Sequence, residues 1–374
     1  MLPSVPTDQS SRLAFVDSLR GLAAVMVLGT HLLHRSVLDA SLHRILPHVV
    51  TNVMSFGDKG VQVFFVISGF VIVLSLGGGR LTRASALLFA LRRQIRLDPV
   101  YWVALLATFG GVLIEKRAGF PLANPPPSMW DLVLNALYVG KRSRHEAIME
   151  VSWTLAVEIQ FYLLTLVILG IAGFRARQSD HLRRVMLGLL MASGLASLGV
   201  SVASGNFDDR SSASMYWVYF ALGALIAFAH LKRAQWRYPM ALGLAMLVAC
   251  AFDGAADRPR LLTGVATASV LSLGSLRPML AAALGRPRIL QYLGRRSYSL
   301  YLAHDLVVSL VMRAGFKLTG TNAGWALGWM MLAAALSFAA TEVLYRCVEK
   351  PSVACSNRVK RDGLRALSLC WRRA

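Results

Sequence analysis

The chain has 374 residues, of which 56% are hydrophobic and 16% are charged, and its mean hydropathy is +0.54. This composition excludes an ordinary soluble globular domain and indicates a membrane protein. The formal net charge of +21 would suit a protein that binds nucleic acid. Short loops that retain Lys and Arg on the cytoplasmic side explain the charge without a polynucleotide, so we expect no nucleic-acid partner.

Uncharged apolar runs, such as Gly60–Gly77, are long enough to cross the hydrocarbon core as helices. The predicted spans are 18–37, 60–77, 97–114, 153–174, 185–204, 215–231, 238–252, 261–276, 297–316 and 323–345. With the N-terminus inside, most Lys and Arg residues fall in cytoplasmic loops, and both termini are then cytoplasmic. We therefore predict an all-α polytopic membrane protein, a bundle of about ten transmembrane helices. Its membrane domain, 18–345, lies between a cytoplasmic N-terminal segment, 1–17, and a basic cytoplasmic tail, 346–374.

Two segments depart from the pattern of long spans. Met129–Gly140 is too short to cross the membrane and follows the proline-rich stretch Asn124–Pro127, so we expect a re-entrant or interfacial segment. Leu81–Arg96 alternates apolar and basic residues at helical spacing, as in a helix that lies on an anionic leaflet. Neither segment changes the orientation of the remaining spans.

The N-terminus is polar and lacks the pattern of a cleavable signal peptide, so the first span is expected to remain in the mature protein. Cys250, Cys347, Cys355 and Cys370 lie far apart and show no metal-ligand spacing, and from them we expect neither a disulfide nor a metal site. The two halves of the chain show no convincing internal duplication.

The first span carries candidate functional residues. Asp17 and Ser18 are helix-capping residue types at its start. Arg20 and His31 are separated by about three turns plus 20°, so they share one helix face, roughly 16 Å apart along the axis. Ionisable groups inside a membrane usually face the bundle interior and mark a functional site. An arginine that anchors the membrane edge and a hydrogen-bonded core histidine would explain the same two residues.

His34 and His304 are further candidates for a metal ligand or a catalytic base. His31 and His34 have the i,i+3 spacing of a metal pair, but no carboxylate or thiolate stands beside them at ligand spacing, so we predict no metal site and place His34 at the outer boundary. His304 is expected to be a core residue of the ninth span. Asp305 beside it leaves a proton relay open.

Six sequence blocks follow one another along the chain. They are FVDSLRGLAAVMVLGTHLLH, GVQVFFVISGFVI, RRQIRLDPVYW, SWTLAVEIQFYLL, SYSLYLAHDLVV and VEKP. Each block is weak alone, but the ordered set resembles the membrane acyltransferase family 3 and covers nearly the whole chain. The first block matches the opening helix of that family, with a basic residue and a His separated by ten positions. The second acid of the family's tryptophan–glutamate motif is Ile159 here, which leaves Glu158 alone.

The resemblance implies an integral-membrane O-acyltransferase in the bacterial inner membrane. It would move an acyl group, expected to be acetyl, from cytoplasmic acyl-CoA to a hydroxyl of a cell-surface glycan, a lipid-linked sugar or a similar acceptor. Acyl-CoA, the acceptor and membrane lipids are the implied partners. His31, Arg20 and Glu158 are the catalytic candidates, although Glu158 would serve equally well as a residue that locks helices together.

Arg93 and Arg96 stand at the cytoplasmic mouth of the third span, where cationic side chains would bind the phosphates of coenzyme A. An ordinary positive-inside cluster that contacts lipid headgroups is the alternative. His31 would act as a general base on the acceptor hydroxyl or as a nucleophile that forms an acyl-histidine. A secondary transporter or glycan flippase without acyl-transfer activity is the rival function for the whole chain.

Overall fold

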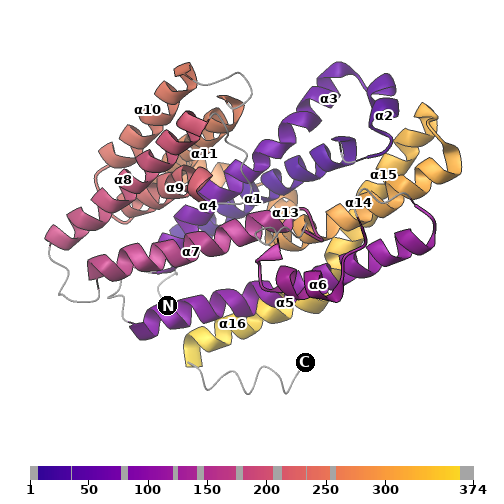
Figure 1. Cartoon of the computed structure of the whole chain (residues 1–374). Coiled ribbons are helices and arrows are strands. Elements are labelled where there is room, and N and C mark those ends of the chain that lie inside the picture. Colours follow the sequence, from indigo (N-terminus) through magenta and orange to yellow (C-terminus); the bar gives the residue numbers. More distant parts are fainter. Residues whose placement is uncertain are drawn as a thin grey trace, which may run out of the picture. The chain divides into compact units, whose positions relative to one another are not determined.

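The computed structural model describes residues 7–34, 36–76, 83–120, 125–140, 147–173, 180–204, 213–232, 234–252 and 258–362. All regular secondary structure in these ranges is helical, which confirms the predicted all-α class (Figure 1). Six helical segments are long and apolar enough to cross a membrane, and Ser152–Ile168, Trp217–His230 and Arg237–Ala251 are shorter apolar helices. The described part of the chain therefore has the make-up of a multi-pass membrane protein.

The helices follow the hydrophobic pattern closely. They are α1 Thr7–His34, α2 Asp39–Ile45, α3 His48–Ser55, α4 Gly60–Ser75, α5 Arg83–Arg117, α6 Met129–Ala136, α7 Ser152–Gly173, α8 Asp180–Ser204, α9 Trp217–His230, α10 Arg237–Phe252, α11 Arg258–Leu276, α12 Pro278–Leu284, α13 Arg288–Arg295, α14 Ser297–Thr319, α15 Ala323–Leu344 and α16 Lys350–Asp362. Every predicted span coincides with a helix, namely α1, α4, α5, α7 to α11, α14 or α15. The short segment after the prolines forms α6, whose length cannot span a bilayer.

Several local predictions need correction. Helix α1 begins at Thr7, so Asp17 and Ser18 lie inside it rather than at its cap, and the Ser18 hydroxyl donates to the Ala14 carbonyl 3.0 Å away. The basic stretch up to Arg96 is no separate surface helix, because α5 continues through Pro99 without a break. Neighbouring helices allow proline inside a membrane helix by satisfying the freed backbone groups.

The C-terminal segment also differs from expectation. Helix α15 continues through a π-helical turn, Tyr345–Glu349, into α16, so the predicted tail is helical as far as Asp362, and residues 363–374 lie outside the described part. Cys250 and Cys347 are not in a disulfide, whereas Cys355 is disulfide-bonded, so the expectation of no disulfide was wrong. Spacing along the chain does not decide which cysteines pair, because pairing depends on their distance in the folded protein.

The chain divides into two compact units. Unit 1 comprises residues 1–23, 59–87 and 157–295, and unit 2 comprises residues 24–58, 88–156 and 296–374. Helices α1, α5 and α7 each contribute residues to both units. The candidate residues are therefore described within the unit to which each belongs.

In unit 1, α9 is the central helix, with every residue from Trp217 to Ala229 buried. It packs against α4 at two glycines, since a Cβ atom on Gly69 would overlap the Phe220 carbonyl oxygen and one on Gly223 would overlap the Val66 carbonyl oxygen. Small residues that let two backbones touch are the usual means of helix association in membranes. The contact fixes the packing of α4 on α9.

In unit 2, α5 runs alongside α14 from Leu97 to Glu115. The Tyr298 hydroxyl donates to the Leu97 carbonyl at 3.0 Å, and a Cβ on Gly111 would meet the Leu306 side chain at 2.6 Å. At the far end the Arg313 guanidinium lies 3.3 Å from the buried Glu115 carboxylate. The residue numbers of the contacts increase in the same direction along both helices, so α5 and α14 run parallel.

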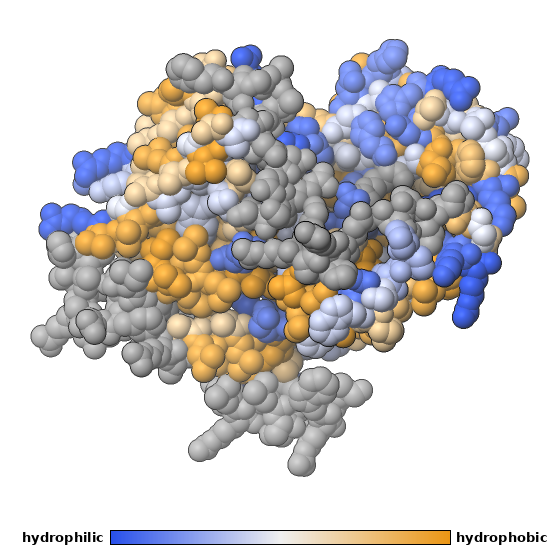
Figure 2. All heavy atoms as spheres, viewed as in Figure 1, coloured by the Kyte–Doolittle hydropathy of each residue, from blue (hydrophilic) through white to orange (hydrophobic). Residues whose placement is uncertain are grey.

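Large apolar side chains are exposed on the outside of several of these helices. In α7, Leu163 and Val167 are more than half exposed, and Figure 2 shows hydrophobic colouring over this helix on the face drawn. The membrane-length segment that contains α15 has only 22% of its most apolar window buried. Apolar surface of this extent needs a lipid environment rather than water.

The close approach of α4 and α9 predicts that Gly223→Ala destabilises the protein. The added methyl group overlaps backbone, and such overpacking costs about 1–3 kcal/mol, which lowers the melting temperature by several degrees. Gly243→Ala on α10 is the matched control, because a Cβ at this position meets nothing within 4 Å. Thermal melts in detergent should separate the two variants, and equal melting temperatures would contradict the proposed contact.

Candidate active site

Two histidines from distant parts of the sequence meet in unit 2. His31, in the last turns of α1, places its Nδ1 atom 2.8 Å from Nε2 of His304 on α14, and the ring centroids are 4.8 Å apart. The Asp305 carboxylate lies 3.6 Å from the same Nδ1 atom. His304 is buried, whereas the His31 and Asp305 side chains keep 16% and 13% of their surface exposed. His31 and Asp305 are therefore the members of the group that keep some exposed surface.

The hydrogen bonds determine which ring nitrogens carry protons. Nδ1 of His304 lies 2.8 Å from the Leu300 carbonyl oxygen, and because a carbonyl only accepts, this Nδ1 must donate. In neutral His304 the Nε2 atom is then an acceptor, so Nδ1 of His31 donates to it. The tautomer follows from the network, and it leaves the lone pair of His31 on Nε2. An imidazole nitrogen in this state can accept a proton from a substrate.

The His304 ring makes a second aromatic contact. The Tyr301 ring packs edge to face against it, with centroids 6.0 Å apart, and the Tyr301 hydroxyl shares a 2.9 Å hydrogen bond with Thr154 on α7. Thr154 follows Trp153 in the tryptophan–glutamate block. This block is thus connected to the histidine pair through Thr154 and Tyr301.

The start of α14 is fixed by a buried carboxylate. Glu349, in the VEKP block, is 2% exposed and accepts hydrogen bonds from the Ser299 backbone N–H at 3.2 Å and the Ser299 hydroxyl at 2.5 Å. A further ion pair joins Arg296 to Glu342 of α15 at 2.6 Å. These contacts lock α14 to the end of α15 and so set the position of His304.

The two predicted phosphate ligands lie on α5 just before it meets α14. Arg93 and Arg96 are half-buried, and the Arg93 guanidinium lies over the Phe89 ring at 5.9 Å. The adjacent Arg92 serves another purpose, because its Nε donates to the Ser356 carbonyl at 3.2 Å and the Ser356 hydroxyl donates back to the Arg92 carbonyl at 2.9 Å. Arg92 thus holds α16 against α5, where Figure 1 shows the two helices side by side.

Arg20 and Glu158 belong to unit 1. Arg20 is half-buried on α1, next to Gly21, which packs directly on the backbone of α13 at Leu290. Glu158 of α7 accepts hydrogen bonds from the Ser68 hydroxyl of α4 at 3.0 Å and from the Tyr162 hydroxyl one turn along α7. These contacts show Glu158 bridging α7 and α4, which is the structural role that the sequence left open for it.

The structure also brings together residues that sequence reasoning kept apart. His304 was expected to be a core residue, and it is buried, but it also contacts His31. His34 does not pair with His31 as a ligand set. It lies instead beside Asp39 and His43, whose i,i+4 spacing was visible in the sequence. The break between α1 and α2 hid this grouping.

Comparison with known proteins gives a family. Residues 13–343 match the model of the acyltransferase 3 family, described as "Acyltransferase domain". The chain is 27% identical over 379 residues to "Acyltransferase MdmB" of Streptomyces mycarofaciens, covering 91% of each chain. It is 29% identical over 280 residues to "Exopolysaccharide production protein ExoZ" of Rhizobium meliloti (strain 1021), covering 71% of this chain and 80% of that protein. No solved structure shows a significant match.

The tautomer assignment can be tested directly by nitrogen NMR. In protein labelled with ring-¹⁵N histidine, His31 should show a protonated Nδ1 and an unprotonated Nε2 at neutral pH, with signals assigned from His31→Ala and His304→Ala. In His304→Ala the His31 pattern should change to a mixture of tautomers, because the acceptor for its Nδ1–H is lost. A proton on Nε2 of His31 in the unaltered protein would contradict the network.

Proposed function

This chain belongs to the acyltransferase 3 family, and we propose that it is an O-acyltransferase that uses cytoplasmic acyl-CoA, most simply acetyl-CoA, as donor. The acceptor is a hydroxyl of a cell-surface glycan, a lipid-linked sugar or a similar molecule. Family membership and the curated relatives support acyl transfer by a membrane protein. We place it in the bacterial inner membrane, with about ten spans and both termini in the cytoplasm, on the positive-inside pattern.

The observation that carries the proposal is the 2.8 Å contact between His31 and His304. It holds the His31 ring so that Nε2 presents a lone pair, as a general base requires. The Asp305 carboxylate, 3.6 Å from Nδ1 of the same ring, stabilises the imidazolium that forms when Nε2 takes up a proton. His304 and Asp305 act through His31 and are positioning residues.

In the proposed step, the acceptor hydroxyl attacks the thioester carbonyl carbon while its proton passes to Nε2 of His31. Collapse of the tetrahedral intermediate breaks the carbon–sulfur bond, and the proton on His31 is transferred to the departing coenzyme A sulfur. The products are the acyl ester and the free thiol. The sequence left open a route through an acyl-histidine, in which Nε2 itself attacks the thioester. The same lone pair would serve that route.

The arrangement of α5 and α14 supports donor binding by Arg93 and Arg96. Both arginines precede Leu97, whose carbonyl binds Tyr298 at the start of α14. His304 lies six residues further along α14, about 9 Å on at the rise of an α-helix. The arginines and the histidine pair thus stand at different heights along one helix pair. This suits a donor whose phosphates bind at one end while a flexible arm carries the thioester to the other.

Arg20 and Glu158 receive more limited proposals. Arg20 and His31 both belong to helix α1, and their shared function stays a prediction from their spacing in the sequence. We propose that Arg20 neutralises negative charge on the donor. The hydrogen bonds that Glu158 accepts from Ser68 and Tyr162 support a helix-locking role, and its part in acyl transfer stays a prediction.

The acceptor class rests on the relatives alone. One of them is named as an exopolysaccharide production protein, which favours a glycan hydroxyl as acceptor for this chain. The other is named only as an acyltransferase, and it covers more of both chains. Mass spectrometry of surface polysaccharides and lipids from cells with and without the gene would identify the acylated molecule.

If His31 is the general base, its replacement should abolish most of the acyl transfer. Purified His31→Ala should transfer labelled acetyl from acetyl-CoA at least about 100-fold more slowly than the unaltered protein, since general base catalysis contributes factors of this size. His304→Ala should lower kcat and shift the pH profile while leaving the donor KM unchanged. His48→Ala on α3, an exposed histidine outside the site, is the matched control. Retained activity in folded His31→Ala would remove the proposed base.

If Arg93 and Arg96 bind the phosphates of the donor, their replacement should weaken the binding of acetyl-CoA. Arg93→Ala with Arg96→Ala should raise the apparent KM for acetyl-CoA at least about tenfold, because phosphate contacts by charged groups are worth about 1.5–3 kcal/mol each. Arg117→Ala, which removes an exposed cation at the other end of α5, should leave this KM unchanged. Initial rates at varied donor concentration measure both variants. An unchanged donor KM in the double variant would assign Arg93 and Arg96 to lipid contact.

A further inference from the structure

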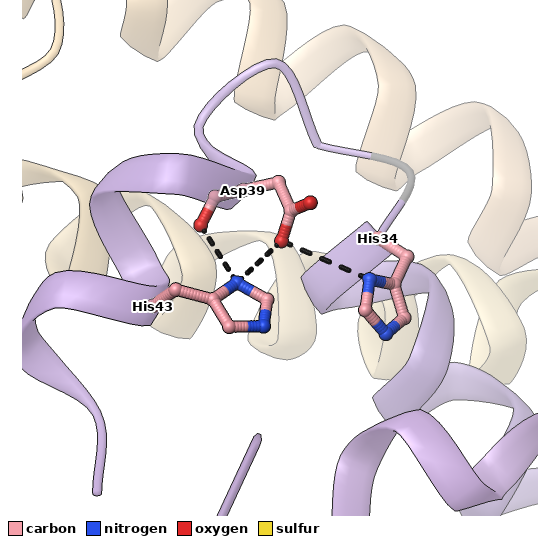
Figure 3. A group of neighbouring side chains, drawn as sticks. All are labelled: His34, Asp39 and His43. Atoms are coloured by element: carbon pink, nitrogen blue, oxygen red, sulfur yellow. Dashed lines mark hydrogen bonds and ion pairs between the residues drawn. The ribbon is translucent and has the colours of Figure 1, made fainter. Parts of the chain in front are cut away.

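A second group of ionisable side chains lies one helical turn beyond His31. It consists of His34 at the end of α1, Asp39 at the start of α2 and His43 one turn along α2 (Figure 3). Each residue offers one nitrogen or oxygen atom, and these atoms all lie within 4.8 Å of one another. None of the three belongs to the proposed transfer site.

The hydrogen bonds around His34 leave a lone pair facing the group. The Ser55 hydroxyl donates its one hydrogen to the Thr51 carbonyl at 2.7 Å, so it accepts from Nε2 of His34, 2.6 Å away. In neutral His34 the Nδ1 atom then carries the lone pair. This Nδ1 lies 3.8 Å from Oδ1 of Asp39, so two acceptors face each other. Histidines that bind metals are typically oriented in this way, with the other ring nitrogen donating to a polar partner.

One oxygen of the Asp39 carboxylate lacks a hydrogen-bond donor in the part of the chain that the structure describes. Its Oδ1 atom is shielded from solvent, and no donor in the described residues is aligned to hydrogen-bond with it. Nδ1 of His43 lies 2.7 Å from this oxygen, but its hydrogen bond is directed to the Asp39 backbone carbonyl at 3.1 Å. A shielded carboxylate oxygen flanked by two imidazole nitrogens is stabilised by a cation placed among them.

We propose that His34, Asp39 and His43 bind one divalent transition-metal ion, with Zn²⁺ as the best match. Two imidazoles and a carboxylate suit Zn²⁺, whereas Ca²⁺ and Mg²⁺ prefer oxygen ligands alone. Tetrahedral bonds of Zn²⁺ to nitrogen and oxygen place the ligand atoms about 3.3 Å apart. The observed separations of 2.7 and 3.8 Å lie on either side of this value. The three side chains are each about two-fifths exposed, so small rotations, together with a shift of the His43 proton from Nδ1 to Nε2, complete the site.

The ion would act as a cross-link between helices. It joins the last turn of α1 to the first turn of α2, and α2 is held in turn by the Ser41 hydroxyl, which donates to the Thr321 carbonyl between α14 and α15 at 2.8 Å. The metal therefore braces the end of α1 that carries His31. Three protein ligands leave a fourth position for water or another small ligand.

The test uses tag-free, full-length protein in detergent, stripped with a chelator and titrated with Zn²⁺ by calorimetry and with Co²⁺ by visible absorption. One ion should bind per chain, with the intense absorption of tetrahedral Co²⁺. Asp39→Asn and His43→Ala should each weaken binding at least about tenfold. His48→Ala, which removes a neighbouring exposed histidine outside the group, should bind as the unaltered protein does.

His43→Cys distinguishes the loss of a metal ligand from the loss of the fold. It keeps a zinc ligand at this position and should therefore retain binding. Gel filtration verifies that each variant is folded. Absence of stoichiometric binding to the unaltered protein would overturn the proposal. Binding that survives Asp39→Asn combined with His43→Ala, or that is lost in His48→Ala, would assign the ion to adventitious surface histidines and would overturn it equally.

Discussion

Two imidazoles side by side in a hydrophobic bundle are stable only if their inward nitrogens are hydrogen-bonded, since an unsatisfied polar group away from water costs free energy. The contact between His31 and His304 meets this condition, and the Leu300 carbonyl accepts a hydrogen bond from the Nδ1–H of His304. The chain of donors runs in one direction and ends with a lone pair on His31. The proposed chemistry depends on that direction.

The rest of unit 2 holds this hydrogen bond in place. Glu349 binds the start of α14 through Ser299, and α5 packs along α14 from Leu97 onward. Within unit 2, residues from three of the sequence blocks that resemble the family therefore lie close together. The first block supplies His31, the penultimate one supplies His304, and the closing VEKP block supplies the buried Glu349 carboxylate that positions α14, the helix that carries His304. These polar contacts account for charged and hydroxyl residues in otherwise apolar helices.

Much of this could be predicted from the sequence, and the part that could not depends on packing. Each hydrophobic run predicted as a span coincides with a helix, and six helical segments are long and apolar enough to cross a membrane. The continuity of α5 from the basic stretch that ends at Arg96 into the third span was missed, because the change from alternating basic and apolar residues to a mainly apolar run suggested two separate helices. The approach of His304 to His31 depends on how α1 packs in unit 2, which no local pattern encodes. The pairing of His34 with Asp39 and His43 was hidden by the break between α1 and α2.

The most direct test of the account is an experimental structure of the protein with a non-reactive acyl-CoA analogue bound, determined by cryo-electron microscopy. We expect the thioester mimic to contact Nε2 of His31, with His304 hydrogen-bonded to Nδ1 of the same ring. The phosphates should lie at Arg93 and Arg96. A donor bound elsewhere, with the His31 ring turned toward lipid, would contradict it.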